Sequence, residues 1–284
     1  MRATGVDAPV ITGNYIDGVA RPAKGGRTYA MYNPARPDEL VGHAALSSAV
    51  DVDAAVLAAH SAYPAWSRTS YIERAVRLNE VADYLEAGQD DVDQRARLFC
   101  REHGKPIKET HLEVSRLGDR FRTTAAYADR LARDEIEHGP PFDTIITRQP
   151  RGVATLIVPW NWPLSILGAK LPQALMAGNT VVVKPSELSV LAPSMTLQKI
   201  AEMFPPGVIN IVTGDANEIG DNLVGHPLVR FVNFTGSVRI GKHVMKVAAD
   251  QLTPVTLELG GNDPAIVCAD ARLDDKAFMN MYLG

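Results

Sequence analysis

The stretch VATLIVPWNWPLSILGAKLPQALMAGNTVVVKPSE, residues 153–187, contains the order of elements that decides the fold. It begins with an apolar run (Val153–Val158), continues with helical periodicity (Leu164–Met176) and returns to a short apolar strand (Val181–Val183). Short, wholly apolar strands that alternate with helices are typical of a parallel sheet that is covered on both faces. The stretch therefore predicts a strand–helix–strand unit of an α/β protein.

Further strands and helices alternate as the chain continues. The strands are predicted at Val208–Val212, Arg230–Phe234 and Val255–Leu257, and the helices at Ala192–Met203, Glu218–Val224 and Val238–Ala249. Ligands of such open sheets bind in the crevice beyond the carboxyl ends of the parallel strands. We therefore expect the functional residues where these strands end.

The first half of the chain has a different pattern. Residues 1–50 carry Gly, Asn and Pro turn signals between short β-prone runs, which predicts short strands and loops. Residues 51–136 have helical periodicity, with a capping box at Ser70-x-x-Glu73 and a long amphipathic helix at Lys108–Arg133. The charges on these helices are expected to form solvated faces.

The composition excludes several classes of protein. The chain has 284 residues, of which 46% are hydrophobic and 22% charged, and its formal net charge is −4. This globular composition gives no electrostatic reason to bind nucleic acid or an anionic membrane. Two cysteines without metal-ligand spacing argue against a metal site and fit a reducing compartment, so we expect a cytoplasmic protein. The apolar stretch Leu156–Gly178 contains three prolines and does not resemble a membrane span.

The motif FTGSVRIG, residues 234–241, lies where a predicted strand ends and a helix begins. Gly236 allows a tight turn and Ser237 can cap the helix, whose first N–H groups and dipole favour an anion such as a pyrophosphate. His243 stands where a P-loop has its magnesium-binding Ser or Thr, which argues against a P-loop phosphotransferase. Taken alone, the motif also fits an ordinary strand–helix turn.

Two other motifs follow predicted strands. In Lys184-Pro185-Ser186-Glu187 the Lys and Glu side chains can hydrogen-bond a ribose diol, and the carboxylate would repel a 2′-phosphate, which favours NAD over NADP. The alternative is a surface ion pair. In PWNWP, residues 159–163, the amide of Asn161 can donate to a developing oxyanion, and the alternative is a packed aromatic turn.

A fourth motif, LELGGNDP, residues 257–264, places Glu258 between two leucines before a Gly-Gly turn. Burial makes a carboxyl group hold its proton more readily, which suits a general base, and the alternative is a turn-capping Glu. Cys268, at the end of an apolar run, and Cys100, on a predicted helix, are expected to be small structural residues rather than nucleophiles.

Taken together and in this order, PWNWP, KPSE, FTGS-x-x-x-G and ELGGNDP resemble the NAD(P)-dependent aldehyde dehydrogenase superfamily, from Asn33-Pro34 through Phe278. The resemblance implies a Rossmann-like cofactor domain, a small aldehyde as substrate and a homodimer or homotetramer. It also implies covalent chemistry. A cysteine thiolate attacks the aldehyde, a hydride passes to NAD, and a water activated by a Glu releases the carboxylic acid.

The resemblance also implies roles for residues at the matching positions. Asn161 resembles the oxyanion-stabilising amide, Glu258 the general base and Lys170 a lysine near the active site. Trp162 departs from the commoner Phe at its position. The implied cofactor contacts are Ile157, Pro159, Trp160, Lys184, Ser186, Glu187, Gly214, Gly220, Phe234, Thr235, Gly236, Ser237, Gly241, Glu258, Leu259 and Gly260.

Four segments are expected from this resemblance. Residues 1–135 form the N-terminal strands and helices, 136–152 an extended bridging hairpin, 153–260 the Rossmann-like NAD-binding core and 261–284 the start of a truncated catalytic domain. Within them, Thr144–Gln149 is expected to pair with the strand that follows it, and Pro264–Val267 and 274–284 to form a strand and a helix.

The family's nucleophilic cysteine is expected a few residues beyond position 284. Cys268, ten residues after Glu258, does not match its position. We therefore expect residues 1–284 to lack the nucleophile and the oligomerisation strand, and to be inactive alone. The alternative is a non-catalytic NAD-binding module.

Overall fold

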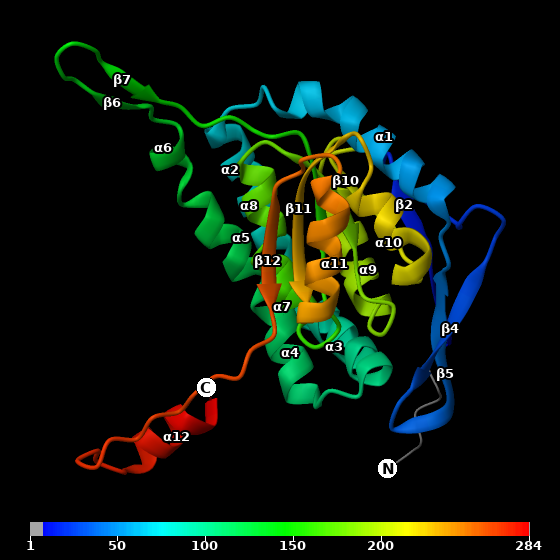
Figure 1. Cartoon of the computed structure of the whole chain (residues 1–284). Coiled ribbons are helices and arrows are strands. Elements are labelled where there is room, and N and C mark those ends of the chain that lie inside the picture. Colours follow the sequence, from blue (N-terminus) through cyan, green and yellow to red (C-terminus); the bar gives the residue numbers. More distant parts are fainter. Residues whose placement is uncertain (1–7, 284) are drawn as a thin grey trace.

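The computed structural model describes residues 8–283, and its centre is a seven-stranded sheet (Figure 1). From one edge to the other, its strands are β12 (Val255–Leu259), β11 (Val229–Gly236), β8 (Val153–Ile157), β9 (Thr180–Lys184), β10 (Ile209–Ile211), β2 (Asn14–Ile16) and β3 (Val19–Arg21). The strands from β12 to β10 are parallel, which confirms the predicted α/β sheet. The short N-terminal strands β2 and β3 extend this sheet antiparallel, an arrangement that the sequence did not indicate.

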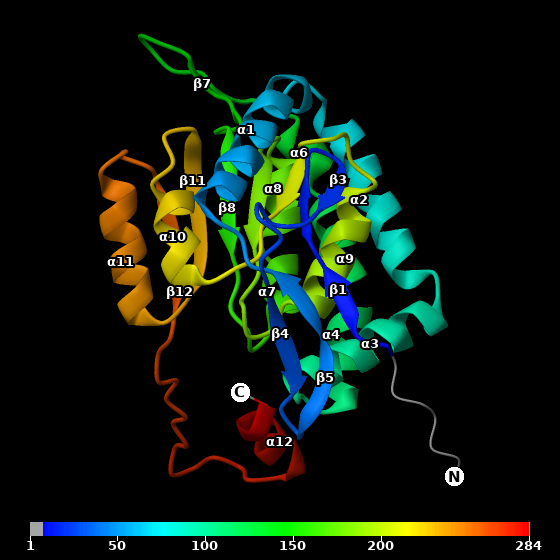
Figure 2. The ribbon, with the colours of Figure 1, turned by 90° about the vertical axis from the view of Figure 1, so that its right-hand side faces the viewer.

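Helices cover both faces of the sheet (Figure 2). One face carries α1 (Ala49–Trp66), α10 (Ala216–Val224) and α11 (Val238–Ala249), and the other carries α8 (Leu171–Met176) and α9 (Leu191–Ala201). On β9, Val182 packs into the cluster on the α1 side, while Val181 and Val183 pack into the cluster on the α9 side. Because both faces are buried, the central strands consist mainly of apolar residues.

A further layer of helices packs outside α8 and α9. Its members are α2 (Tyr71–Glu86), α3 (Gln89–His103), α4 (Ile107–Ser115), α5 (Leu117–Ala125) and α6 (Ala128–Leu131). The predicted capping box is present at α2, where Ser70 Oγ accepts the Glu73 amide and the Glu73 carboxylate accepts the Ser70 amide. The single helix predicted at Lys108–Arg133 is wrong. Arg116 ends α4 and precedes α5 with φ −86° and ψ −4°, which interrupts the regular helical backbone.

The helix predicted at Leu164–Met176 is also divided, into α7 (Pro163–Gly168) and α8. Pro172 has no amide hydrogen, and in a continuous helix its ring would clash with the carbonyl of Gly168. The interruption leaves Lys170 at the N-terminus of α8, where it is 4% exposed.

Two smaller sheets lie beside the main one. The first contains β1 (Val10–Thr12), β5 (Arg36–Ala45) and β4 (Thr28–Asn33), and the second is a hairpin of β6 (Glu135–Glu137) and β7 (Thr144–Ile146) that projects from the body (Figure 1). The predicted pairing of Thr144–Gln149 with the following strand is therefore wrong. That strand, β8, already has β9 and β11 as neighbours on its two sides.

Residues 260–274 form neither a helix nor a strand, and they lead to α12 (Asp275–Leu283), which lies apart from the main sheet (Figures 1 and 2). The strand predicted at Pro264–Val267 is not formed. These residues are exposed and pair with no strand within residues 8–283. A strand forms only where a neighbouring strand accepts and donates its backbone hydrogen bonds. The predicted C-terminal helix matches α12, with Gly284 outside the described residues.

Candidate active site

The register of the parallel strands gathers most predicted site residues at the carboxyl edge of the sheet. The paired residues are Ile157 with Lys184, Ile157 with Phe234, Thr235 with Glu258 and Gly236 with Leu259. In Figure 1 the arrowheads of β11 and β12 both point to this edge, beside α4 and α7. Residues that are far apart in the sequence are thus brought together where ligands of α/β sheets bind.

The N-terminus of α11 offers donors at this edge. Ser237 caps the helix, as predicted, because its Oγ accepts the Ile240 amide at 3.3 Å. Within residues 8–283 the amides of Val238 and Arg239 make no hydrogen bond, and the buried Thr235 Oγ1 has no partner either. A ligand with anionic oxygens would satisfy these groups and the positive end of the helix dipole.

Two glycines of the FTGS-x-x-x-G motif are required by close packing. A Cβ on Gly241 would lie 2.4 Å from Leu259 Cδ2, so the absence of a side chain lets α11 approach β12. A Cβ on Gly236 would lie 2.5 Å from Cζ of the Phe234 ring. Gly236 does not have a positive φ, so its requirement is steric rather than conformational.

Lys184 and Glu187 form a donor–acceptor pair at the end of β9. Lys184 Nζ lies 3.1 Å from Glu187 Oε2 and donates to the Pro185 carbonyl at 3.3 Å. The Lys184 side chain is 3% exposed, whereas that of Glu187 is 39% exposed. Between them, the hydroxyl of Ser186 accepts the Leu188 amide. The ion pair of the alternative interpretation is therefore present, and Glu187 together with the Pro185 carbonyl compensates the buried Lys184 ammonium.

The PWNWP turn is anchored through its backbone carbonyls. His103 Nε2 donates to the Trp160 carbonyl at 2.9 Å, and Lys105 Nζ donates to the Asn161 carbonyl at 2.7 Å. The Lys105 ammonium also lies 3.6 Å from the centre of the Trp162 ring. The backbone of the turn is therefore fixed, while the side chain of Asn161 stays exposed toward solvent.

A buried ion pair completes this anchor. Lys105 Nζ lies 2.8 Å from Glu113 Oε2, and Glu113 Oε1 accepts the amides of Leu164 and Ser165 at 2.8 and 2.9 Å, at the start of α7. Both charged side chains are buried, contrary to the expectation of solvated helix faces. Nothing in the spacing of Lys105 and Glu113 predicts these contacts, which join residues about fifty positions apart in the sequence.

Lys170 lies between the helices and the strands of the site. It donates to Asn233 Oδ1 on β11, and its burial lowers its pKa to about 8, while the charge of Glu258 acts in the opposite direction. Lys170 and Glu258 are thus electrostatic neighbours. Glu258 itself is exposed, so the expected burial is wrong, because β12 is an edge strand with β11 on one side alone within residues 8–283.

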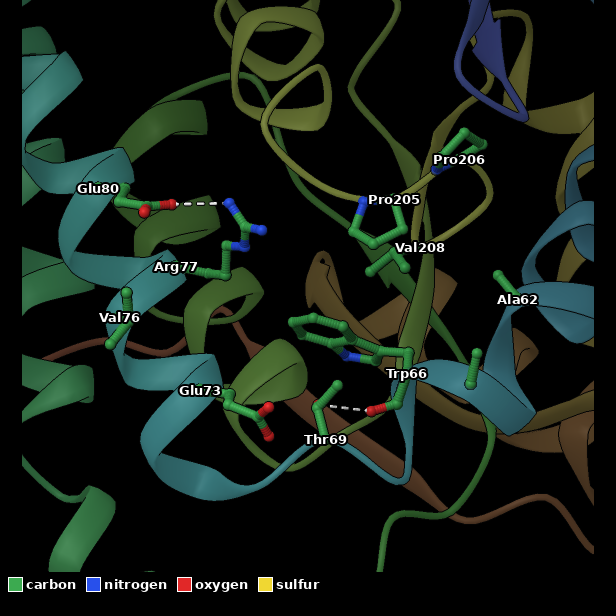
Figure 3. A pocket seen from close by; sticks show the side chains of 11 residues that line it. Ala62, Trp66, Thr69, Glu73, Val76, Arg77, Glu80, Pro205, Pro206 and Val208 are labelled. Carbon is green, nitrogen blue, oxygen red and sulfur yellow. Dashed lines mark hydrogen bonds and ion pairs between the residues drawn. The ribbon is translucent and has the colours of Figure 1, made fainter.

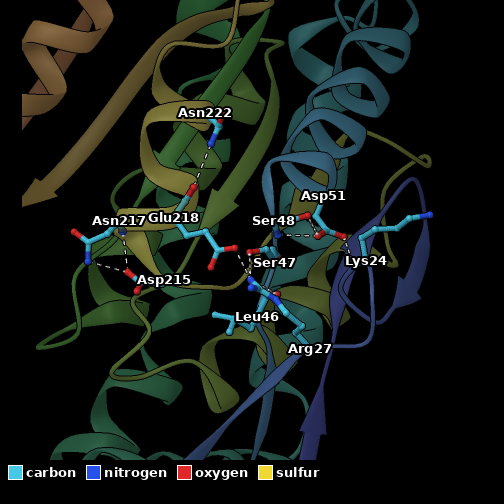
Figure 4. A network of polar contacts seen from close by, with 10 residues as sticks. All are labelled: Lys24, Arg27, Leu46, Ser47, Ser48, Asp51, Asp215, Asn217, Glu218 and Asn222. Carbon is cyan, nitrogen blue, oxygen red and sulfur yellow. Dashed lines mark hydrogen bonds and ion pairs between the residues drawn. The ribbon is translucent and has the colours of Figure 1, made fainter.

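The loop after β10 holds Gly214 with φ +152°, and a Cβ there would lie 3.0 Å from the amide nitrogen of Ser47. Figure 4 shows how polar contacts fix this region. Asp215 caps α10 by accepting the Asn217 amide, and Arg27 pairs with Glu218. Gly220 lies within α10, and a Cβ added to it would meet no atom within 4 Å, so close packing does not require this glycine.

Neither cysteine has a special environment. Cys268 is exposed in the irregular segment before α12, so the expected structural position at a strand end is wrong. Cys100 is half-buried on α3, where burial raises the pKa of its thiol. In the part of the chain that the structure describes, no group of three or more His, Cys, Asp or Glu could hold a metal ion. No helix in that part is both long and apolar enough to cross a membrane.

A separate cavity of about 450 Å³ lies near the amino end of β10, at the opposite edge of the sheet (Figure 3). It is lined by Trp66, Pro205, Pro206 and Val208, with Glu73, Arg77 and Glu80 on α2. None of the predicted site residues lines this cavity, so the carboxyl edge remains the candidate site.

Comparisons with known proteins identify the family to which the chain is similar. A family model described as "Aldehyde dehydrogenase family" matches residues 21–283. A 3-sulfolactaldehyde dehydrogenase of Pseudomonas putida is 39% identical over 264 residues, which are 92% of this chain and 53% of that protein. An Escherichia coli succinate-semialdehyde dehydrogenase, named for NADP(+), is 38% identical over 93% of this chain and 54% of its own length.

Solved structures show the same relationship. Betaine aldehyde dehydrogenase of Staphylococcus aureus, in complex with NAD+, matches with a TM-score of 0.82 and 32% identity over 88% of this chain and 50% of that chain. The chain thus spans about half the length of the curated relatives it matches. With a family match over nearly all of its residues and the Rossmann-like fold of solved members, the chain belongs to the aldehyde dehydrogenase family.

Proposed function

We propose that these residues bind NAD at the carboxyl edge of the sheet and serve the oxidation of an aldehyde to a carboxylic acid. The observation that carries the proposal is the strand register. It aligns the Lys184–Glu187 pair, the capped N-terminus of α11 and Glu258 with its neighbour Lys170 along one edge. The relatives that match the chain are named for aldehydes as substrates.

The polar groups at this edge suit a dinucleotide. Lys184 and Glu187 would hold a ribose diol, and Gly236, Ser237 and the free amides of α11 would hold the pyrophosphate. The unpartnered Thr235 Oγ1 supports the fit. The remaining proposed contacts are Ile157, Pro159, Trp160, Ser186, Gly214, Gly220, Phe234, Gly241, Leu259 and Gly260. When bound, NAD would supply the hydride acceptor.

The carboxylate of Glu187 favours NAD over NADP. A ribose 2′-phosphate at this position would face a half-exposed negative charge, which costs electrostatic energy. One relative is named for NADP(+), and one solved member of the family is in complex with NAD+. The choice between the two cofactors must therefore be tested at Glu187 itself.

Three side chains are proposed to act on the substrate. The Asn161 side-chain amide donates a hydrogen bond to the aldehyde oxygen as negative charge develops on it. Glu258 accepts a proton from the attacking thiol or water, and Lys170 stabilises its carboxylate. Neither Cys100 nor Cys268 is proposed as the nucleophile, so residues 1–284 alone should not turn over an aldehyde.

The test uses the purified 1–284 chain. Isothermal titration should show NAD binding that is lost in Lys184→Ala and kept in Lys246→Ala, an exposed lysine at the far end of α11. Incubation with NAD and a panel of aldehydes should give no NADH. A folded chain that does not bind NAD would overturn the cofactor site. NADH formation that is abolished in Cys268→Ala would overturn the assignment of the cysteines.

A non-catalytic NAD-binding module is the second candidate, and the environment of Cys268 favours it, since this thiol is exposed in an irregular segment. NADH formation by a fusion of residues 1–284 to the unmatched second half of a relative, with none from residues 1–284 alone, would support the dehydrogenase. Tight NAD binding without turnover in both would support the module.

A further inference from the structure

A second cavity adjoins the proposed oxyanion group. It has a volume of about 490 Å³ and lies between the α4–α5 junction and α7. Trp162 and Ser165 line one side, and Leu112, Arg116, Asp119 and Arg120 line the other. Asn161 is not among the lining residues, but Trp162, which follows it in the PWNWP turn, is, so the cavity lies next to the turn that carries the proposed oxyanion group.

The free charge in this cavity is positive. Glu113 also contributes to the lining, but its carboxylate is held by Lys105 Nζ and by two backbone amides. Within residues 8–283 the guanidinium groups of Arg116 and Arg120 make no hydrogen bond or ion pair, and neither does the Asp119 carboxylate. The unpaired side chains of the cavity therefore carry two positive charges and one negative charge.

Arg120 is positioned by packing. A Cβ on Gly168 would lie 2.9 Å from Arg120 Cγ, so this glycine leaves the space in which the aliphatic part of Arg120 rests on α7. The first part of the Arg120 side chain is thereby placed at the wall of the cavity, while the residue as a whole is exposed. A guanidinium can bind a carboxylate through two parallel hydrogen bonds.

We propose that Arg116 and Arg120 receive the carboxylate of the substrate, so that the site takes a short aldehyde with an acid group at its other end. This inference rests on the proposed aldehyde site and adds the substrate class. In this arrangement the aldehyde carbon lies at Asn161, and the carboxylate lies between α5 and α7.

The experiment compares two aldehydes of the same chain length, 4-oxobutanoate and butanal. Their binding to the 1–284 chain with saturating NAD is measured by ligand-observed NMR and by quenching of tryptophan fluorescence. At low salt the acid should bind about tenfold more tightly, and the ratio should decrease as salt screens the arginines. Arg116→Met and Arg120→Met should each reduce the ratio at least about threefold, and Arg120→Lys should retain part of it.

Arg130→Met, on the exposed face of α6, is the matched control and should leave the ratio unchanged. Circular dichroism shows whether each variant is folded. Equal affinities in the wild-type chain, or a preference for the acid that survives both arginine variants, would overturn the proposal. NAD binding measured on the same samples distinguishes a failure of the proposed cofactor site from a failure of the proposed carboxylate site. Loss of NAD binding with a retained acid preference would contradict the cofactor site alone.

Discussion

Lys105 Nζ and Glu113 Oε2 lie 2.8 Å apart in the interior, where the lysine also binds the PWNWP turn and the glutamate binds the start of α7. The ammonium donates to the Asn161 carbonyl, and the carboxylate accepts two amides at the start of α7. The ion pair therefore links the helical half of the chain to the turn that presents the proposed oxyanion group.

Removal of one partner of this ion pair should strongly destabilise the fold. Lys105→Met leaves the Glu113 carboxylate buried without its counter-ion, and we expect the free energy of unfolding to decrease by about 3–5 kcal/mol. Urea denaturation measures the change. Lys105→Met/Glu113→Gln should recover part of the loss, because no unpaired charge remains. If the loss of stability in the double variant equalled the sum of the losses in Lys105→Met and Glu113→Gln, the two residues would not act as a pair.

Lys170 should make stability depend on pH. Its pKa in the folded protein is about 8, below the ordinary lysine value of 10.5. Between these values the unfolded chain binds more protons than the folded one, so the Lys170 contribution to stability increases as the pH rises from about 8 toward 10.5. Below pH 8 Lys170 is charged in both the folded and the unfolded chain, so burial of its charge lowers the free energy of unfolding by the full amount.

Denaturation of the wild type and of Lys170→Met at several pH values measures this contribution. We expect the stability of the wild type relative to the variant to increase by about 1–2 kcal/mol over this alkaline range. Lys246→Met, which removes an exposed lysine, should follow the wild type. Parallel curves for the wild type and Lys170→Met would contradict the lowered pKa.

Gly236→Ala should weaken both the fold and cofactor binding. The new Cβ would meet Cζ of Phe234, a ring that is 5% exposed, and the strand end must shift to accept it. Overpacking of this kind costs about 1–3 kcal/mol, and a displaced α11 N-terminus should lower the NAD affinity by about tenfold. Titration calorimetry measures the affinity, with Gly139→Ala in the exposed β6–β7 loop as the control. An unchanged affinity would show that this turn does not bind the pyrophosphate.

Glu187→Gln should shift the cofactor preference toward NADP. The substitution keeps a hydrogen-bonding group beside Lys184 and removes the charge that opposes a 2′-phosphate. The ratio of NADP to NAD affinity should increase by about three- to tenfold. Glu202→Gln, at the C-terminal end of α9, is the control. A ratio that does not move would place the ribose elsewhere.

The sheet could be predicted because its central strands are buried on both faces. The run Thr180–Lys184 contains three consecutive valines, and such a run fits a covered parallel strand. The three-residue strands β2 and β3 could not be predicted as part of this sheet, since they are too short to show a periodicity. The division of the predicted long helix at Arg116 depends on local backbone geometry that helical periodicity does not contain, whereas the division at Lys170 could have been predicted from Pro172.

The same limit applies to the site. Ser237 was predictable as a cap because the cap, strand and helix are neighbours in the sequence. The exposure of Glu258 was not, because burial depends on what lies beside β12 and not on the flanking leucines. The Lys105–Glu113 pair was missed because its charges look like those of any solvated helix, and its contacts lie 56 and 51 positions away in the sequence.

The support of the PWNWP turn by His103, Lys105 and Glu113 restricts how this protein can be recombined. A chimaera that receives residues 153–260 from a relative inherits the turn without the side chains that were selected to hold it. If residues 103–113 are taken from the same relative as that segment, the turn and the side chains that hold it should again fit each other. Natural substitutions at positions 105 and 113 should therefore occur as a correlated pair, so that the two positions diverge together rather than singly.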